Sequence, residues 1–327
     1  MESYTHKRIH DLLLRAKKPL FIADERIDGD SLGSSLAMVD YLKGLGRHVQ
    51  VFVSTEVPEV YRFLPRIDHC TTDAAVFRDP DVDLVVSFDC SDGAYVGRLV
   101  ATLPGHPTVV NIDHHATNPR YGHVNQVIVE APATAEVVHG FFRTNNIVPS
   151  RDAATCLLTG ICFDTTAFSN SGTNERSLAA ASDLILHGAQ VHDIIRHMFS
   201  SRSVDALRVW GTALERLERR GSSGVVCTYI TQEDMRQHGV SEDEIEGLSN
   251  FLNLVVDAET MIVIRESVDG GVKASMRSLT KDVAKVAKAM GGGGHRLAAG
   301  FSLKPGETTA DAEGCRALVE KIAGMLD

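Results

Sequence analysis

Apolar and polar positions in the first half of the chain follow two alternating patterns. Short runs that are apolar on both faces and rich in β-branched residues predict buried strands at 19–24, 48–53, 83–89 and 108–113. Helical spacing of apolar residues predicts helices at 31–46, 133–144, 150–160 and 177–187. Strands that alternate with helices in this way predict an α/β fold built on a parallel, doubly wound sheet.

The second half has a different organisation. Residues 189–220 are helical in pattern, polar and charged, and the turn-forming sequence RRGSSG closes the stretch. We expect this stretch to be a helical linker between a first domain at 1–188 and a second at 221–327. The second domain has strand patterns at 224–230, 260–267 and 271–278, and helical patterns at 282–290 and 310–326. It is therefore predicted to be a smaller α/β domain.

Composition agrees with two globular domains. The chain has 327 residues, of which 43% are hydrophobic and 23% charged. No apolar run approaches the roughly 20 residues that cross a bilayer, and residues 1–18 have the pattern of an amphipathic helix rather than a signal peptide. The six cysteines are scattered without a C-x-x-C pair, which argues against a structural zinc site and a disulfide framework. We therefore expect a cytoplasmic protein without a membrane partner.

Net charge restricts the size of the substrate. At −10 the chain lacks the basic footprint of a protein that binds long duplex nucleic acid. A small or short anionic substrate is compatible with this charge, because bound divalent cations reverse the local potential.

Acidic residues follow the predicted strands. Asp24, Asp28 and Asp30 lie between the first strand and the following helix, and the glycine between the last two permits a tight turn that aims both carboxylates at one point. The free N–H groups of that helix start favour phosphate. The alternative interpretation is an ordinary turn with a helix cap. Asp89 ends a later strand, where ligand sites form in open α/β sheets.

A triplet of polar residues follows the fourth strand. Asp113, His114 and His115 stand at its end, and two adjacent imidazoles there are hard to explain as core filling, since both need polar partners. Asp164 adds a fourth acidic cluster. Together the clusters predict a metal site, and oxygen ligands in excess over nitrogen favour Mn²⁺ or Mg²⁺ ahead of zinc. Paired ions of this kind activate water for phosphoryl displacement.

The motifs DGDSLGS, DCSD, NIDHH and GICFDT, in this order, resemble those of the DHH phosphoesterase superfamily. That superfamily includes RecJ-like exonucleases, manganese pyrophosphatases, nanoRNases and cyclic-dinucleotide phosphodiesterases. GGGGH followed by AAG resembles the signature of the DHH-associated substrate domain. The resemblance covers nearly the whole chain and is greatest to the stand-alone branch of nanoRNases and 3′-phosphoadenosine-5′-phosphate (pAp) phosphatases.

By this resemblance the site would hold two Mn²⁺ ions, with Mg²⁺ as the alternative. Asp28 and Asp89 would bind one ion, with Asp89 bridging to the other. The second ion would be completed by Asp30, His114 and Asp164. His115 would face the scissile phosphate, and Asp113 would orient its neighbours.

One position departs from the family pattern. Where the family usually has a histidine, four residues before the first Asp of D-G-D, this chain has Asp24. An aspartate still binds a hard cation, so we include Asp24 among the metal ligands. The extra negative charge leaves metal preference and activity open.

The resemblance also implies a substrate reader in the second domain. Consecutive glycines let a backbone approach an anion closely, and an arginine grips a phosphate bidentately. A flexible loop and an ordinary exposed arginine are the alternative interpretations. The expected contacts to the non-scissile end of a nucleotide are Arg277, Ser278, Gly292, Gly293, Gly294 and His295.

Other polar residues are expected to have ordinary roles. Thr134 and Glu136 begin a helix and are expected to cap it, although the family has a similar stretch near its site. His139 is expected at the surface or as a cap.

Three functions are compatible with these residues. The favoured one is a Mn²⁺-dependent hydrolase of short oligoribonucleotides that also acts on pAp. The alternatives are a phosphodiesterase for a cyclic dinucleotide or its linear product, and a nucleotide-binding protein in which Asp24 weakens hydrolysis. Substrate choice, cleavage polarity and oligomeric state, a homodimer included, stay open.

Overall fold

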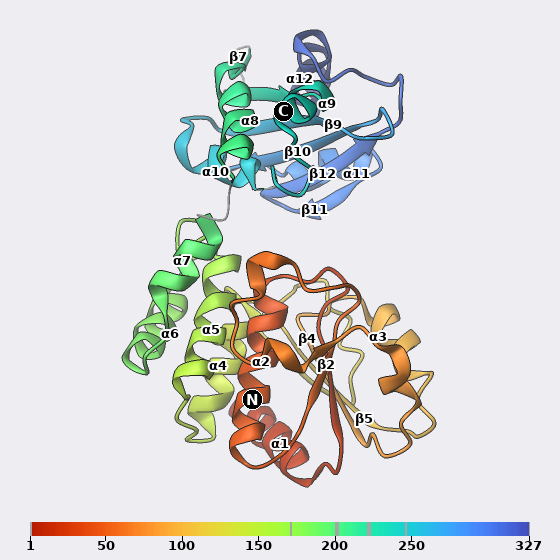
Figure 1. Cartoon of the computed structure of the whole chain (residues 1–327), viewed down its shortest axis with the longest axis vertical. Coiled ribbons are helices and arrows are strands. Elements are labelled where there is room, and N and C mark those ends of the chain that lie inside the picture. The colour runs from red at the N-terminus through yellow and green to blue at the C-terminus, as the bar shows by residue number, and fades with distance from the viewer. Residues whose placement is uncertain (1, 171, 200–202, 221–223, 246, 327) are drawn as a thin grey trace. The chain divides into compact units, whose positions relative to one another are not determined.

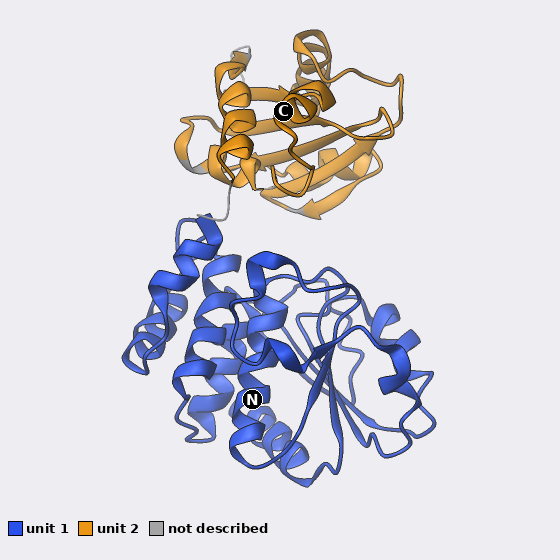
Figure 2. Cartoon of the chain, in the orientation of Figure 1, with its two compact units in different colours: residues 1–201 blue, residues 202–327 orange. Residues whose placement is uncertain are grey.

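A computed structural model of the chain describes residues 2–170, 172–199, 203–220, 224–245 and 247–326. It forms two compact units, residues 1–201 (unit 1) and 202–327 (unit 2), shown in Figure 2. None of the described helices combines the length and apolarity needed to span a bilayer.

Unit 1 is built on a six-stranded parallel sheet with the order β3-β2-β1-β4-β5-β6. The strands are β1 (Pro19–Ile22), β2 (Gln50–Phe52), β3 (Cys70–Thr71), β4 (Leu84–Phe88), β5 (Thr108–Asp113) and β6 (Val124–Val127). This arrangement confirms the predicted doubly wound sheet and all four predicted strands. The short β3 and the polar β6 were not predicted, because neither presents a continuous apolar run.

Helices cover both faces of this sheet (Figure 1). They are α1 (Glu2–Arg15), α2 (Gly29–Gly44), α3 (Gly93–Val100), α4 (Thr134–Thr144), α5 (Arg151–Asp164), α6 (Glu175–Leu186) and α7 (Val191–Phe199). Short 3₁₀ turns lie at Glu59–Tyr61, Ile67–His69 and Ala74–Arg78. Successive residues of β1 serve opposite faces: Phe21 packs with α1, α2, α4 and α5, whereas Leu20 and Ile22 pack with α3. This two-sided burial explains why the predicted strands are apolar throughout.

Unit 2 has a mixed six-stranded sheet with the order β11-β12-β10-β9-β8-β7, in which only β8 and β9 pair in parallel. Its strands are β7 (Glu218–Arg220), β8 (Val225–Ile230), β9 (Thr260–Glu266), β10 (Val272–Ser278), β11 (Gly293–His295) and β12 (Ala298–Leu303). Its helices are α8 (Val204–Glu215), α9 (Gln232–His238), α10 (Leu248–Val255), α11 (Val283–Ala289) and α12 (Ala312–Leu326). The α/β character predicted for the second domain is confirmed.

The stretch 189–220, expected as a helical linker, is shared between the two units. Helix α7 packs on α5 in unit 1, and α8 packs on α9 and β8 in unit 2. The side chains of α8 explain this division, because Ala206, Val209, Trp210 and Ala213 are buried in the core on one face of the unit 2 sheet.

The four-glycine run forms part of a sheet edge. Gly293 and Gly294 belong to β11, which pairs with β12. A Cβ on Gly292 would lie 2.2 Å from the carbonyl oxygen of Gly300, whereas a Cβ on Gly293 would meet nothing within 4 Å. Close packing of two backbones therefore accounts for glycine at one of these positions and not at its neighbour.

This contrast predicts the stability of two alanine variants. Gly292→Ala should lower the free energy of unfolding of unit 2 by about 1–3 kcal/mol, because the methyl group overpacks the strand pair. Gly293→Ala is the matched control and should change it by less than about 0.5 kcal/mol. Urea unfolding followed by fluorescence measures both, since Trp210 is the only tryptophan and is buried in unit 2. Equal destabilisation by the two substitutions would contradict the packing argument.

Candidate metal centre

The strand order of unit 1 reverses between β1 and β4, which creates a crevice at the carboxyl ends of these strands. Asp24 follows β1, Asp89 directly follows β4, and Asp113 is the last residue of β5. The topology therefore brings together acidic residues that are up to 89 positions apart in the sequence.

Asp28 and Asp30 are positioned by the start of α2. The Asp28 carboxylate caps the helix by accepting the backbone N–H groups of Asp30 (3.1 Å) and Ser31 (2.9 Å). Asp30 lies in the first turn and is fully buried. Its two carboxylate oxygens accept the backbone N–H groups of Thr134 (2.6 Å) and Ala135 (2.8 Å), at the N-terminus of α4.

Small residues let α2 and α5 approach closely. A Cβ on Gly33 would lie 2.3 Å from the Cys156 carbonyl oxygen, and a Cβ on Gly160 would lie 2.6 Å from Asp30 Oδ1. Any larger residue at either position would separate the helices. The close approach brings Asp164, the last residue of α5, to the same place as Asp30.

Asp89 has a left-handed backbone conformation, with a φ of 64°. This conformation is uncommon outside glycine and often marks functional sites, although aspartate tolerates it better than most residues. The Asp89 N–H donates to Ile112 O (3.0 Å), and Asp89 Oδ1 accepts the hydroxyl of Thr134 (2.8 Å). These bonds hold the carboxylate in the crevice.

Asp113 organises the triplet that it begins. Its Oδ1 accepts the backbone N–H groups of His114 (2.7 Å) and His115 (3.2 Å) and the ring Nδ1–H of His115 (2.8 Å). Its Oδ2 accepts the Asn118 amide at 2.5 Å. Asp113 is thus a fully buried carboxylate whose oxygens are occupied by hydrogen bonds, as expected of an orienting acid.

His114 presents a buried nitrogen to the acidic cluster. Its Nδ1 lies 3.1 Å from the Ala131 carbonyl oxygen, which only accepts, so Nδ1 carries a proton and Nε2 of the neutral ring keeps its lone pair. Nε2 is buried, 3.1 Å from Asp164 Oδ2 and 3.6 Å from Asp89 Oδ1. It pairs with Asp164 when the ring is protonated, and in the neutral ring its lone pair faces the carboxylates.

The described residues form two overlapping groups with ligand atoms close enough to share an ion. One contains Asp30, His114 and Asp164, and the other Asp89, His114 and His115. The first reproduces the set expected for the second ion. Asp24 and Asp28 lie beside these groups and belong to neither.

Burial and the close approach of several carboxylates raise the pKa values of four aspartates at the site. Desolvation and the charge of Asp164 raise the pKa of Asp28 to about 6, and they raise the pKa of Asp30 well above its ordinary value. Burial and then Asp30 raise the pKa of Asp89 in the same direction. Burial also raises the pKa of Asp24.

Hydrogen bonds and nearby charges shift the pKa values of Asp113 and His114. Burial acts to raise the pKa of Asp113, but hydrogen bonds from His115 and Asn118 outweigh it and leave the pKa below its ordinary value. Burial acts to lower the pKa of His114, but the carboxylates of Asp164 and Asp30 raise it to about 9. Without a cation, protons must therefore balance the charge of this cluster.

This donor set fits a divalent cation. Carboxylates gather around the buried Nε2 of His114, and a cation would replace the protons that the cluster otherwise requires. Oxygen ligands predominate, as Mn²⁺ and Mg²⁺ prefer.

The expected substrate residues lie in unit 2. Arg277 donates to Asn250 Oδ1 and Met276 O, both at 2.9 Å, and burial lowers the pKa of its guanidinium. Ser278 is buried, and its hydroxyl bonds to Glu259 O (2.9 Å) and accepts Lys281 N–H (3.0 Å). The Ser278 hydroxyl is thus committed to a turn. Residues 292–294 are exposed, and the His295 side chain lies outside the described part of the structure.

A segment whose residues were expected only to cap a helix supports three of the candidate ligands. We call residues 131–135 the bracket. Its Ala131 carbonyl accepts from His114, its Thr134 hydroxyl donates to Asp89, and its Thr134 and Ala135 N–H groups bind Asp30. Thr134 was expected to cap α4, but Ala133 is the N-cap residue. The sequence signal was the resemblance of this stretch to one near the family's site.

Comparison with known proteins identifies relatives of both units. Residues 19–161 match the DHH family, N-terminal domain, and residues 222–323 match the DHHA1 domain. The bifunctional oligoribonuclease and PAP phosphatase NrnA of Thermus thermophilus is 31% identical over 90% of this chain and 87% of its own length. A protein of the same name from Bacillus subtilis is 21% identical over 85% of this chain and 87% of its own. The crystal structure of an exopolyphosphatase-related protein from Bacteroides fragilis has the same fold, with a TM-score of 0.87, 22% identity, and coverage of 99% and 97% of the two chains.

The raised pKa values predict how unit 1 responds to pH without metal. Asp28, with a pKa of about 6, and His114, with a pKa of about 9, bind protons in the folded state that the unfolded chain releases near pH 4 and 6.5. Stability should therefore fall as pH rises through these intervals. We expect the calorimetric midpoint of unit 1 in EDTA to be about 5 °C or more lower at pH 8.5 than at pH 5.5.

Added Mn²⁺ supplies the matched control for that measurement. Because the cation replaces the protons, its stabilising effect on unit 1 should grow with pH, while the Trp210 transition of unit 2 serves as an internal reference. A midpoint in EDTA that rises with pH would contradict the charge balance described above.

Proposed function

Since the chain belongs to the DHH family, we propose that it is a metal-dependent phosphoesterase that hydrolyses short oligoribonucleotides and also dephosphorylates pAp. The observation that carries this proposal is the convergence of ligand atoms at the buried His114, which shares one group with Asp30 and Asp164 and a second with Asp89 and His115. The names of the two NrnA relatives supply the substrate class.

We assign two ions to the site, Mn²⁺ with Mg²⁺ as the alternative. Asp30, His114 and Asp164 would hold one ion. Asp28 and Asp89 would hold the other, with Asp89 bridging and Asp24 adding an oxygen ligand. When bound, such ions activate water and stabilise the charge that develops on a phosphoryl group.

The protein residues around the ions orient the reacting groups. Asp113 holds the Nδ1 side of the His115 ring at 2.8 Å, so the opposite edge of the ring points away from this acid. In this arrangement His115 would donate a hydrogen bond to the scissile phosphate. Asn118 anchors Asp113 by also donating to the Cys90 carbonyl oxygen (3.1 Å), which keeps the triplet fixed to the loop after β4.

Residues of unit 2 are proposed to contact the substrate. The Arg277 side chain is half-buried, and no described acid forms an ion pair with it, so a phosphate of the substrate would supply the missing charge. The exposed glycine backbone of β11 and His295 are proposed as further contacts. The Ser278 side chain would contribute through the turn that it stabilises.

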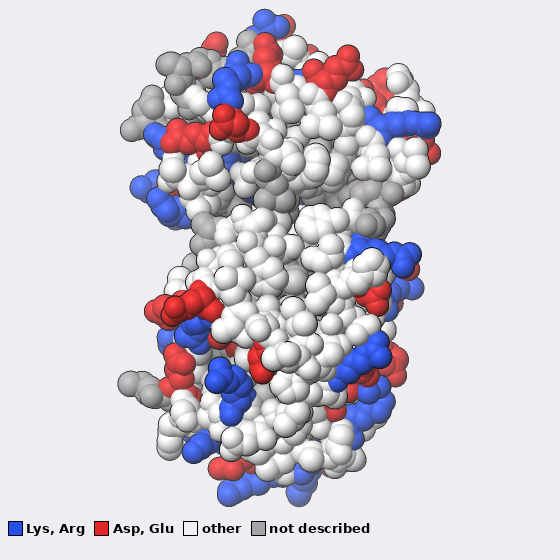
Figure 3. Space-filling view, turned by 90° about the vertical axis from the view of Figure 1, so that its left-hand side faces the viewer, with Lys and Arg blue, Asp and Glu red and all other residues white. Residues whose placement is uncertain are grey.

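Surface charge favours a small substrate. On the face drawn in Figure 3, Lys and Arg side chains lie interspersed with Asp and Glu near the margins of each unit, and the middle of the face is largely uncharged. A net charge of −10 also disfavours long polyanions. Short RNA and mononucleotides avoid this repulsion because the metal site binds their few phosphates.

An assay of the purified protein tests the proposal. With Mn²⁺, it should cleave RNA of two to five nucleotides and release phosphate from pAp. Faster turnover of c-di-AMP or its linear product would instead support the cyclic-dinucleotide alternative. Nucleotide binding without turnover of any of these substrates would contradict the proposed activity and support a binding protein.

Removing the central imidazole should abolish activity. We expect His114→Ala to lower kcat/KM for a dinucleotide more than about 100-fold, because the ion loses its nitrogen ligand and the buried carboxylates lose a partner. His192→Ala, at an exposed position of α7, is the control and should leave kcat/KM unchanged. Activity of the His114 variant at the wild-type level would contradict the assigned ion site.

Asp24 should determine the choice of ion. Asp24→His replaces an oxygen ligand by nitrogen and removes one negative charge, so preference for Mn²⁺ over Mg²⁺ should increase. The ratio of half-saturating Mg²⁺ and Mn²⁺ concentrations measures this preference. An unchanged ratio would show that residue 24 does not contact an ion.

A further inference from the structure

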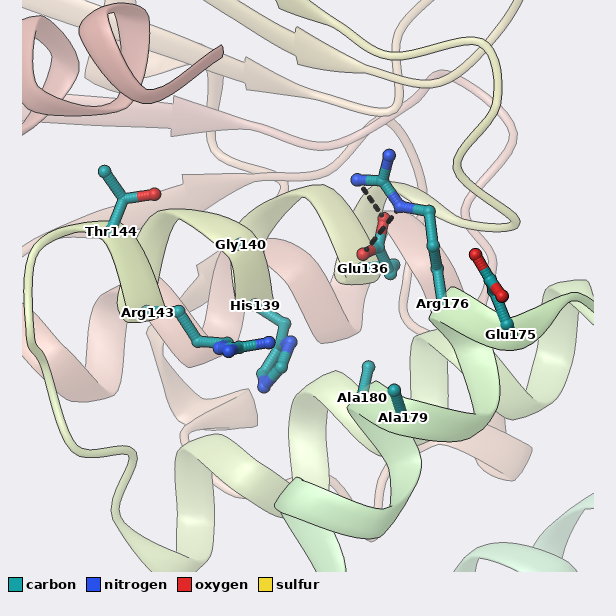
Figure 4. A pocket seen from close by; sticks show the side chains of 9 residues that line it. All are labelled: Glu136, His139, Gly140, Arg143, Thr144, Glu175, Arg176, Ala179 and Ala180. Atoms are coloured by element: carbon teal, nitrogen blue, oxygen red, sulfur yellow. Dashed lines mark hydrogen bonds and ion pairs between the residues drawn. The ribbon is translucent and has the colours of Figure 1, made fainter.

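The bracket is attached to α6 at both of its ends. Glu136 follows the bracket directly, and its Oε1 and Oε2 lie 3.2 Å from Arg176 Nε and Nη2 (Figure 4). Glu130 precedes the bracket, and its carbonyl oxygen accepts the Asn174 side-chain amide at 3.1 Å. Asn174 is the N-cap residue of α6 and Arg176 lies in its first turn. The start of α6 therefore contacts both ends of the bracket, the segment that forms hydrogen bonds with Asp30, Asp89 and His114.

The two members of the Glu136–Arg176 ion pair differ in exposure. The Glu136 side chain is 8% exposed and the Arg176 side chain 35%. Arg176 lines a pocket of about 670 Å³ between α4 and α6, together with Arg143 and His139. A buried carboxylate that loses its partner is strongly disfavoured, so Arg176 determines whether Glu136 keeps its position.

Apart from Arg176, none of the described residues that line the pocket forms an ion pair with Glu136. Arg143 extends toward His139 in Figure 4 and forms no ion pair with a described residue. His139 was expected at the surface, but it is buried and its Nε2 lies 2.7 Å from Asp183 Oδ2. Glu136 itself lies outside both groups of candidate metal ligands. Its contact with Arg176 therefore acts on the metal centre only through the backbone of α4.

We propose that Arg176 is a positioning residue for the metal centre. Through Glu136 it fixes the first turn of α4, and with it the N–H groups that orient Asp30 and the hydroxyl that orients Asp89. The inference rests on the proposed function, because it assumes that these carboxylates bind ions. Loss of Arg176 would let the start of α4 shift, so that the carboxylates would no longer converge.

Metal binding by the metal-free protein tests this role independently of turnover. Arg176→Met keeps most of the side-chain volume but removes the guanidinium, and we expect it to weaken Mn²⁺ binding 10- to 100-fold, measured by titration calorimetry. Arg143→Met is the matched control, since it removes a guanidinium from the same pocket, and it should bind Mn²⁺ as the wild type does. Arg176→Lys should recover part of the affinity, because an ammonium supplies charge without the bidentate geometry.

Turnover supplies a second readout. At limiting Mn²⁺ the Arg176→Met variant should be slow on a dinucleotide, and raising the Mn²⁺ concentration should restore much of kcat while KM for the dinucleotide stays near the wild-type value. A merely structural role for Arg176 would lower thermal stability without this dependence on Mn²⁺. If Arg176→Met does not fold, Glu136→Gln combined with Arg176→Met removes the buried charge as well and is judged by the same Mn²⁺ titration.

The outcomes separate this inference from the proposed function. Failure of the wild type to bind Mn²⁺ and to cleave any tested substrate would overturn both. An active wild type, with equal Mn²⁺ affinity in the Arg176→Met and Arg143→Met variants, would overturn the positioning role alone. Selective loss of Mn²⁺ affinity in the folded Arg176 variant supports it.

Discussion

Repulsion between buried carboxylates is the constraint on which the rest of unit 1 depends. Asp30 and Asp89 are almost fully buried beside Asp28 and Asp164, and burial together with the neighbouring carboxylates raises the pKa values of Asp28, Asp30 and Asp89. The described ion pairs give the cluster no Lys or Arg, and its basic partners are His114 and His115. In the metal-free protein, repulsion within such a cluster lowers the stability of the fold. Bound cations would neutralise the carboxylates and remove this repulsion.

The surrounding fold holds these groups together against that repulsion. Apolar cores on both faces of the parallel sheet fix the strand ends, and Gly33 and Gly160 let α2 and α5 pack closely enough for their acids to meet. Backbone N–H groups of the bracket then donate hydrogen bonds to the Asp30 carboxylate, and the Thr134 hydroxyl donates one to Asp89. Packing thus sets the distance between the acids, and hydrogen bonds set their directions.

Unit 2 relies on backbone packing in a different way. Its glycine run is exposed, and Gly293 and Gly294 belong to the paired edge strand β11. Close packing against the backbone of β12 excludes a side chain at Gly292, whereas the position of a Cβ on Gly293 is open. Arg277 adds a positive charge that lacks a described acid partner. Unit 1 thus gathers acidic side chains around a buried histidine, whereas unit 2 presents an exposed glycine backbone and an arginine.

The sequence by itself determined the parallel sheet, the four apolar strands and the candidate acids, because two-sided burial and strand-end chemistry are local patterns. It could not reveal that Thr134 contacts Asp89, that Arg176 contacts Glu136, or that residues 189–220 divide between two units. Those facts depend on the contacts that distant segments make. The sequence identified the groups able to bind an ion, and only the tertiary structure decided which residues hold them in place.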